Sequence, residues 1–175
     1  MSDDAGITSD EALKAEAKSL LLTSDVDMRI ARDGRWYHEG EPINRMPLVR
    51  LFSTVLKRGD DGIFWLVTPV ERAKIVVEDA PFTIVEMTNK GRGENQKISF
   101  RNNVDTWFDL DLGHPIRIEY KHENAAPSPY VLVREGLEGR ILRSVYYQLI
   151  ELADVQNNEL GVWSNGKFHV LGSIE

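Results

Sequence analysis

The chain has 175 residues, of which 42% are hydrophobic and 28% are charged, with a formal net charge of −7 and no cysteine. These proportions predict a soluble, folded protein of one ordinary domain or two small ones. The lack of cysteine excludes disulfides, zinc–thiolate centres, iron–sulfur clusters and thiol nucleophiles. No apolar run approaches the ~20 residues that cross a bilayer, and the acidic N-terminus lacks the features of an export signal. We therefore expect a cytoplasmic protein.

Acidic residues are concentrated at the start of the chain. Residues 1–25 hold six acidic side chains against Lys14 and Lys18, which leaves the remaining 150 residues close to balance at −3. A surface this close to charge balance lacks the basic charge that neutralises phosphates, so we expect no binding to DNA or RNA. It does not attract anionic lipids either, and we expect no membrane partner.

One helix is predicted in this acidic leader, residues 1–25. Thr8 and Glu11 have the T-x-x-E spacing of a capping box. Apolar residues at helical spacing follow, namely Leu13, Ala17, Leu20 and Leu21. We expect this stripe to pack on the rest of the protein; a helix that binds a partner is the alternative.

The segment IARDGRWYHEG (30–40) predicts a β-hairpin around Asp33-Gly34, a pair typical of two-residue type I′ turns. With that loop, Arg29 lies opposite His38. His38 and Glu39 are then either an acid/base pair or part of a structural strand. We favour the structural role, because a second copy of this segment, described below, has no His-Glu pair.

Two further helices are expected. The first covers about 44–58, with Asn44 as its cap and Gly59 as its end, and the second covers 142–155. Asn165-Gly166 predicts a type I′ hairpin near the C-terminal end. Short apolar or alternating runs, interrupted by a loop at 89–95, predict strands. These strands are 63–67, 73–77, 82–87, 97–101, 107–112, 115–120 and 130–134.

The sequence contains an internal repeat. Residues 30–34 resemble 132–136 at an offset of 102, and four positions between Arg45 and Trp65 align with positions between Arg143 and Trp163 at an offset of 98. We therefore predict an α+β fold of mainly antiparallel sheets in two related modules, 26–95 and 96–175. Each has the order strand, turn, strand, helix, strands. Halves of this size are marginal alone, so we expect them to pack together around a polar pocket.

No metal, cofactor or catalytic residue is predicted. Asp109 and Asp111 would lie on one side of a strand, but any half-exposed strand shows that pattern. The four histidines lack the spacing of metal ligands, and the sequence has no G-x-S-x-G segment. A Ser-His-Asp set assembled in space stays open as an alternative.

Polar residues after the strand 97–101 are better candidates for binding. Arg101 and Asn102 carry donors that can hold a phosphate or the edge of a nucleobase. An ordinary polar strand end is the alternative. Trp36 and Trp107 could stack on a base, but their spacing within strands leads us to expect both in the core.

The chain also carries five longer motifs, WYHEGEPI (36–43), LVTPVE (66–71), VEDAPF (77–82), ISFRNNV (98–104) and YVLVREGLEGRILRSVYYQL (130–149). Together they resemble a bacterial family, domain of unknown function 1285, from about residue 26 to the end. The resemblance implies a duplicated α+β arrangement whose C-terminal half is similar to pleckstrin-homology-like folds. It also implies a nucleotide-like ligand between the halves and a role in signalling. It offers no established activity and no catalytic residue.

Three functions are consistent with these features. The first is a cytoplasmic sensor or adaptor that binds a small anionic ligand between the modules. The candidate ligand-binding residues are His38, Glu39, Arg50, Arg101, Asn102 and Arg134. Arg50 and Arg101 would neutralise phosphates. The second is a protein-interaction module that uses a sheet edge or the leader helix. The third is a hydrolase that uses His38-Glu39.

Overall fold

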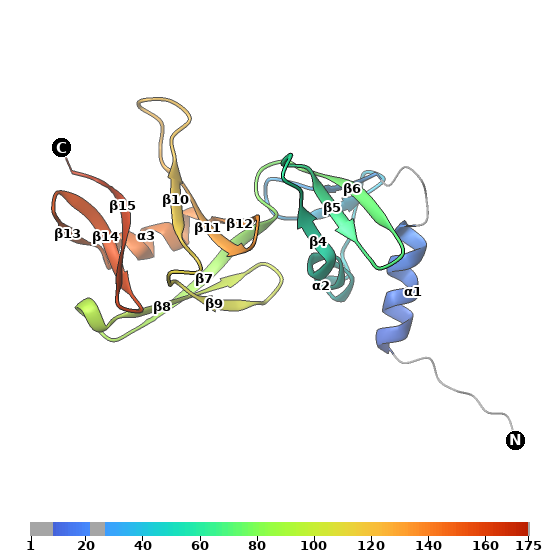
Figure 1. The fold of residues 1–175 in the computed structure, drawn as a ribbon, viewed down its shortest axis with the longest axis horizontal. Helices are drawn as coiled ribbons and strands as arrows, with labels where there is room; N and C mark the ends of the chain where they lie inside the picture. Colours follow the sequence, from blue (N-terminus) through green and yellow to red (C-terminus); the bar gives the residue numbers. More distant parts are fainter. Residues whose placement is uncertain (1–8, 22–26, 175) are drawn as a thin grey trace, which may run out of the picture. The chain divides into compact units, whose positions relative to one another are not determined.

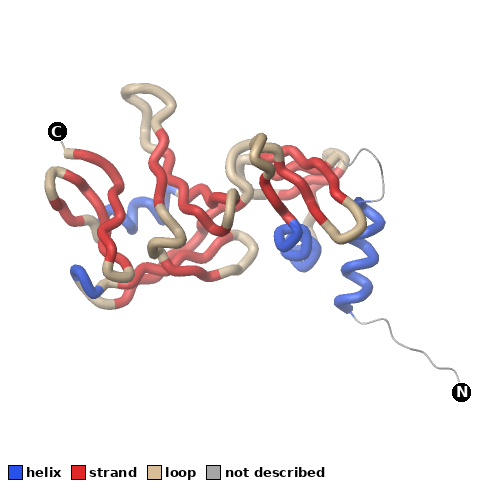
Figure 2. Tube along the Cα trace, viewed as in Figure 1, coloured by secondary structure: helices blue, strands red, loops and turns tan. Residues whose placement is uncertain are grey.

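The computed structural model describes residues 9–21 and 27–174. The protein is mixed α+β and divides into two compact units after Glu78 (Figures 1 and 2). The sequence analysis placed this division at residue 95. The division falls earlier because β7 (Phe82–Lys90) forms a hairpin with β8 (Lys97–Asn102) and also pairs with β12 (Leu137–Ile141). Residues 79–95 therefore belong to the second unit.

The first unit contains a six-stranded sheet and two helices. The strand order is β3-β2-β1-β6-β5-β4, in which the β1–β6 pair is parallel and the other pairs are antiparallel. Its elements are α1 (Ser9–Leu21), β1 (Met28–Ile30), β2 (Trp36–His38), β3 (Glu41–Pro42), α2 (Met46–Val55), β4 (Leu56–Arg58), β5 (Phe64–Val67) and β6 (Arg72–Val77).

The leader helix α1 packs on α2. Ala17 of the apolar stripe is buried, and Arg45, next to α2, forms an ion pair with Glu16. This contact agrees with the expected packing of the leader on the rest of the protein. Thr8 of the predicted capping box lies outside the described residues. None of the helices in the described part of the chain is both long and apolar enough to cross a membrane.

The hairpin of β1 and β2 forms where the sequence predicts it, but with a different register. Ile30 lies opposite Trp36, and Arg29 lies opposite Tyr37, so the predicted Arg29–His38 pair was wrong. The loop between the two strands is one residue longer than predicted. The Gly34 N–H donates to the Ala31 carbonyl and closes a turn, and Gly34 itself has a φ of 90°. The longer loop puts Ile30 and Trp36, both fully buried, on the same face.

The helix α2 is shorter than the predicted 44–58. Arg45 precedes it without a side-chain cap, so the prediction of Asn44 as the cap was wrong. Val55 is its last residue because Leu56–Arg58 pair with β5 as strand β4. Gly59 lies in the turn after that strand, and its N–H donates to the Ile63 carbonyl. The pairing of residues 56–58 with β5 ends this helix, and the hydrophobic periodicity of the sequence does not reveal that pairing.

The second unit contains one six-stranded sheet, one three-stranded sheet, one α-helix and one short 3-10 helix. The larger sheet has the order β10-β11-β12-β7-β8-β9, and the smaller has the order β13-β14-β15. Besides β7, β8 and β12, its elements are η1 (Gly93–Asn95), β9 (Trp107–Asp109), β10 (Ile116–Glu119), β11 (Ser128–Arg134), α3 (Arg143–Glu151), β13 (Asp154–Gln156), β14 (Glu159–Ser164) and β15 (Lys167–Ser173).

Buried apolar residues from both sheets and from α3 form the core of this unit; they include Ile84, Ile98, Phe100, Leu149 and Val162. Polar contacts fasten the smaller sheet to β8. The Ile98 N–H donates to the Ser164 hydroxyl at 2.9 Å, and the Gln96 side-chain amide donates to the Trp163 carbonyl at 3.1 Å. These bonds give hydrogen-bond partners to the Ile98 N–H and to the Trp163 carbonyl, as buried backbone groups require.

The two units repeat one order of elements, as predicted. A hairpin, a helix and a three-stranded meander occur as β1-β2, α2 and β4-β5-β6, and again as β11-β12, α3 and β13-β14-β15. The offset of 98 superimposes β4 on β13 residue by residue and places Trp65 and Trp163 in the middle strand of each meander. The fold is thus two related α+β domains with mainly antiparallel sheets. The likeness to pleckstrin-homology folds stays a prediction.

Candidate functional site

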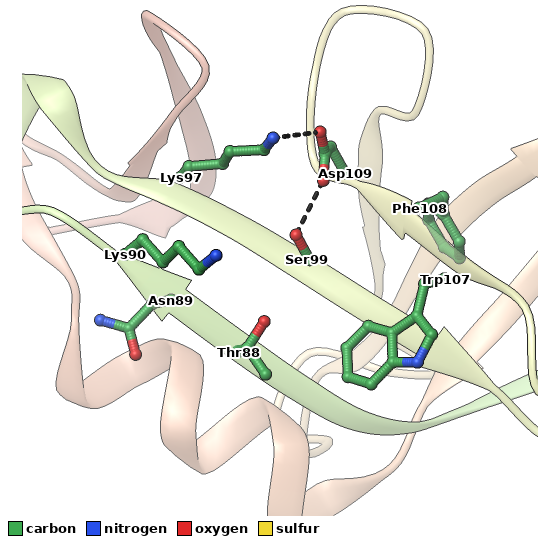
Figure 3. Close-up of a pocket in the computed structure, with 8 residues that line it drawn as sticks. All are labelled: Thr88, Asn89, Lys90, Lys97, Ser99, Trp107, Phe108 and Asp109. Atoms are coloured by element: carbon green, nitrogen blue, oxygen red, sulfur yellow. Dashed lines mark hydrogen bonds and ion pairs between the residues drawn. The ribbon is translucent and has the colours of Figure 1, made fainter.

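An open pocket of about 590 Å³ lies on the strands β7, β8 and β9 of the second unit (Figure 3). Its lining residues are Thr88, Asn89, Lys90, Lys97, Ser99, Trp107, Phe108 and Asp109. Residues directly opposite each other share one face of a sheet. Thr88 lies opposite Ser99, Ser99 lies opposite Asp109, and Lys90 lies opposite Lys97. The polar side chains of the three strands therefore gather on one face, and Ile98 and Phe100 point into the core.

Two lysines face each other across the strands at one end of this pocket. Like charges in directly opposed positions of a sheet destabilise each other. The positive charge of Lys97 is compensated by Asp109, because the Asp109 Oδ2 lies 3.1 Å from the Lys97 Nζ. Lys90 forms no ion pair with any residue that the structure describes. This end of the pocket is thus electropositive, and a bound anion would relieve the repulsion.

An exposed tryptophan marks the other end. Trp107 lies opposite Arg101, four residues along β8 from Lys97, which is a distance of about 13 Å. Its side chain is 46% exposed, so the prediction of a core position was wrong for Trp107, whereas Trp36, at 2%, is buried as predicted. β9 is the last strand of its sheet, and Trp107 gives this end of the pocket a flat aromatic surface.

Asp109 is fixed between these two ends. The Ser99 hydroxyl donates to its Oδ1 at 2.7 Å, and Lys97 contacts its other oxygen (Figure 3). The hydrogen bond from Ser99, followed by the contact with Lys97, holds the pKa of the Asp109 carboxyl below its ordinary value. The carboxylate is therefore ionised at neutral pH, and it orients Lys97 and Ser99 beside the pocket.

Arg101 and Asn102 are adjacent on β8, but internal partners occupy both. Arg101 lies opposite Trp107 and forms ion pairs of 2.7 Å with Glu86 and with Asp105, which raise the pKa of its guanidinium. Asn102 is buried, and its Oδ1 accepts hydrogen bonds from the backbone N–H groups of Val104 and Thr106. Arg101 is thus neutralised in place, and Asn102 holds the turn between β8 and β9.

The other candidate residues lie elsewhere. Arg134 ends β11 with its guanidinium 5.7 Å from the centre of the Phe82 ring, and partial burial lowers its pKa. His38, Glu39 and Arg50 belong to the first unit. His38 is half-buried at the end of β2, and Arg50 lies on the exposed side of α2.

Glu39 and Gly40 form the two-residue turn between β2 and β3. Both have positive φ, of 50° and 79°, and His38 lies opposite Glu41 across the turn. This is the conformation of a type I′ hairpin. The structure therefore places His38-Glu39 in a structural turn, in agreement with the role that the sequence analysis favoured.

The pocket residues Lys90, Thr88 and Ser99 were not candidates in the sequence analysis. A signal for them existed. After the loop at 91–95, polar and apolar residues alternate in KIS (97–99), which is typical of a strand with one polar face, whereas TNK (88–90) before the loop is polar throughout. The pairing of the strands, which brings Thr88, Lys90 and Ser99 onto one face beside Trp107, comes only from the fold.

The fold and the pocket define a protein of two related α+β domains, the second of which carries an open pocket on its sheet. The chain belongs to the DUF1285 family. Residues 21–80 match the domain of unknown function that is the family's N-terminal domain, and residues 81–171 match its C-terminal domain. No curated protein matches the chain.

Two solved structures are similar to this chain. One is a DUF1285 family protein from Silicibacter pomeroyi DSS-3, with 39% sequence identity and a TM-score of 0.82, over 93% of this chain and 95% of that one. The other is a DUF1285 family protein from Shewanella baltica OS155, with 24% identity and a TM-score of 0.58, over 74% of this chain and 94% of that one. The second likeness shows the fold alone.

Proposed function

We propose that the protein binds a small anionic ligand with a planar ring, such as a nucleotide, in the pocket on β7, β8 and β9, and that it acts as a sensor or adaptor. The observation that carries this proposal is the arrangement of Trp107 and the opposed pair Lys90 and Lys97 at the two ends of one pocket. The ring stacks on Trp107, and the anionic groups lie between the lysines.

The separation of the two ends supports this class of ligand. About 13 Å along the strand is close to the reach of a nucleoside diphosphate from its base to its terminal phosphate. Thr88 and Ser99 line the space between and supply hydroxyl groups for a ribose. Arg101 is paired with Glu86 and Asp105, so this proposal assigns the phosphates to the lysines rather than to Arg101.

Isothermal titration calorimetry at low ionic strength with ADP and with pyrophosphate tests the proposal. Lys90→Gln should weaken both ligands about fivefold, the effect of one exposed charge pair. Trp107→Leu should weaken ADP about fivefold or more through lost stacking, and it should leave pyrophosphate unchanged, because pyrophosphate has no ring.

Lys121→Gln is the matched control, because Lys121 is also exposed in this unit but does not line the pocket. It should leave both affinities unchanged. The proposal is wrong if millimolar ADP gives no binding heat, or if Trp107→Leu leaves the affinity for ADP unchanged.

A further inference from the structure

The sheet of the first unit packs on α2 with one of its two faces. Phe52 of α2 stacks on Trp36 of β2 with 5.9 Å between the ring centroids, and Trp36 lies opposite Ile30 of β1. All three side chains are buried, so this is the core face of the sheet. Successive residues of a strand point to opposite faces, so the residues between the core positions form a second face.

Basic side chains gather on the second face. Lys57, Trp65 and Lys74 form a row across the neighbouring strands β4, β5 and β6, because Trp65 pairs with Lys57 on one side and with Lys74 on the other (Figure 1). Arg72 and Val76 lie two residues before and after Lys74 on β6, and therefore on the same face. Val76 is 57% exposed, and the three basic residues are also exposed. We call these five residues the basic face.

The positive charges of the basic face are not compensated within the described part of the chain. Lys57, Arg72 and Lys74 form no ion pair with any residue in it. Glu78, which follows β6, is bound to Arg29 at 2.5 Å. Like charges on one face repel each other, so a partner with negative charge would offset this repulsion.

The spacing along β6 favours an extended peptide as this partner. Arg72, Lys74 and Val76 follow one another at intervals of two residues, which is about 7 Å in a strand. An extended peptide presents alternate side chains on one side at the same interval. Two acidic residues and one apolar residue at alternate positions therefore match the two cations and the exposed valine. Lys57 lies two strands from Lys74, about 10 Å away, and adds to the attraction.

A nucleic acid matches the basic face less well. The net charge of −7 opposes the approach of a long polyanion. Affinity through phosphates grows with the number of cations that contact them, and this face offers three. The guanidinium of Arg72 also lies 3.9 Å from the centre of the Trp65 ring, so it already occupies one side of the ring on which a base would stack.

We propose that the basic face binds an extended acidic segment of a partner protein. Two carboxylates of the segment pair with Arg72 and Lys74, and an apolar side chain contacts Val76. The ion pairs are exposed, so added salt weakens the complex. The basic face belongs to the first unit and the anion pocket to the second, and neither proposal depends on the other.

Fluorescence anisotropy of the full chain at low ionic strength tests the proposal. The probe is a labelled peptide in which two glutamates and then one leucine alternate with serine. Binding should saturate, and Lys74→Gln should weaken it about threefold, the effect of one exposed ion pair. Arg58→Gln is the matched control. Arg58 is also exposed and follows Lys57 on β4, but it points to the other face. Its substitution should change the affinity less.

A charge exchange tests the pairing itself. Lys74→Glu should weaken the peptide about tenfold, because one attraction is replaced by one repulsion. A peptide with lysine in place of its second glutamate should bind Lys74→Glu more tightly than it binds the unchanged protein. Equal binding to the two proteins would contradict the assignment of Lys74.

Five results would overturn the proposal. The first is no saturable binding of the glutamate peptide, and the second is an equal loss of affinity in Lys74→Gln and Arg58→Gln. The third is tighter binding of an oligouridylate with the length of the peptide, since the occupant is then a nucleic acid. The fourth is self-association, measured by ultracentrifugation, that the peptide abolishes, since the occupant is then a second copy. The fifth is a gain in peptide affinity on deletion of residues 1–8, since the leader then occupies the face.

Discussion

Asn102 and Lys90 show how differently residues of similar polarity are used in this protein. Asn102, with its donors and acceptor, looks like a ligand contact in the sequence, yet its carbonyl oxygen accepts two backbone N–H groups in a buried turn. Lys90 lies in a segment that reads as an ordinary loop, yet it lies in an open pocket opposite another lysine. Residue type states what a side chain can bind, and the fold decides whether that capacity is already used.

His169 gives the protein a pH-dependent stability. It is buried in β15, and its Nε2 lies 3.3 Å from the Ser164 carbonyl. Burial lowers the pKa of the His169 imidazole below its ordinary value of 6.5. As the pH falls below 6.5, the unfolded chain therefore binds a proton that the folded chain does not bind. We expect the free energy of unfolding to fall with the pH, by at most about 1.4 kcal/mol per unit.

Urea unfolding between pH 5.5 and 8 checks this expectation. His169→Gln should flatten the dependence, because the titrating group is gone. His122→Gln removes an exposed histidine and should leave the slope as it is. An unchanged slope in His169→Gln would show that other groups cause the dependence.

Single elements of the fold follow local sequence signals wherever a turn fixes the geometry. Asn165-Gly166 forms the predicted type I′ hairpin, with Ser164 opposite Lys167 and positive φ at both turn residues. Asp33-Gly34 carries a similar signal, but its loop is longer because the burial of Ile30 and Trp36 favours another register. Where a turn signal and a hydrophobic face disagree, the buried face decides, because a slip by one residue would expose it.

Two glycines of the β14–β15 hairpin should respond differently to substitution. At Gly166, an added Cβ meets nothing within 4 Å. Gly166→Ala should therefore lower the free energy of unfolding only by the strain of an alanine in the left-handed backbone conformation, about 1–2 kcal/mol. At Gly161, an added Cβ lies 2.5 Å from the His169 carbonyl oxygen and 2.7 Å from the Phe168 ring. We expect Gly161→Ala to lower the free energy of unfolding by more than Gly166→Ala does. Chemical denaturation of both variants measures the difference, and the reverse order would contradict it.

At the scale of the whole molecule, the internal repeat explains the order of elements in both units but not where the chain divides. β7 precedes the second copy in the sequence, yet it lies in the middle of the larger sheet, between β12 and β8. A boundary at residue 95 would separate β7 from β8 and β12, the strands with which it pairs. The division after Glu78 keeps β7 in the same unit as these two strands.

Two fragments test this division. Residues 79–175 contain the complete core of the second unit and should unfold in one cooperative transition, as followed by circular dichroism in urea. Residues 96–175 lack β7, whose Ile84 and Met87 belong to that core. They should show no cooperative transition. Cooperative unfolding of the shorter fragment would show that β7 is dispensable.

The sequence by itself determined the α+β class, the repeated order of hairpin, helix and strands, and the turn at Asn165-Gly166. These features depend on local conformation and on periodicity, which neighbouring residues in the chain set. Only the tertiary structure decided the register at Ile30–Trp36, the end of α2 at Val55 and the place of β7. It also decided the pocket between Trp107 and Lys90. These features depend on pairing between strands far apart in the sequence, and hydrogen bonds across such distances leave no periodic trace in the sequence.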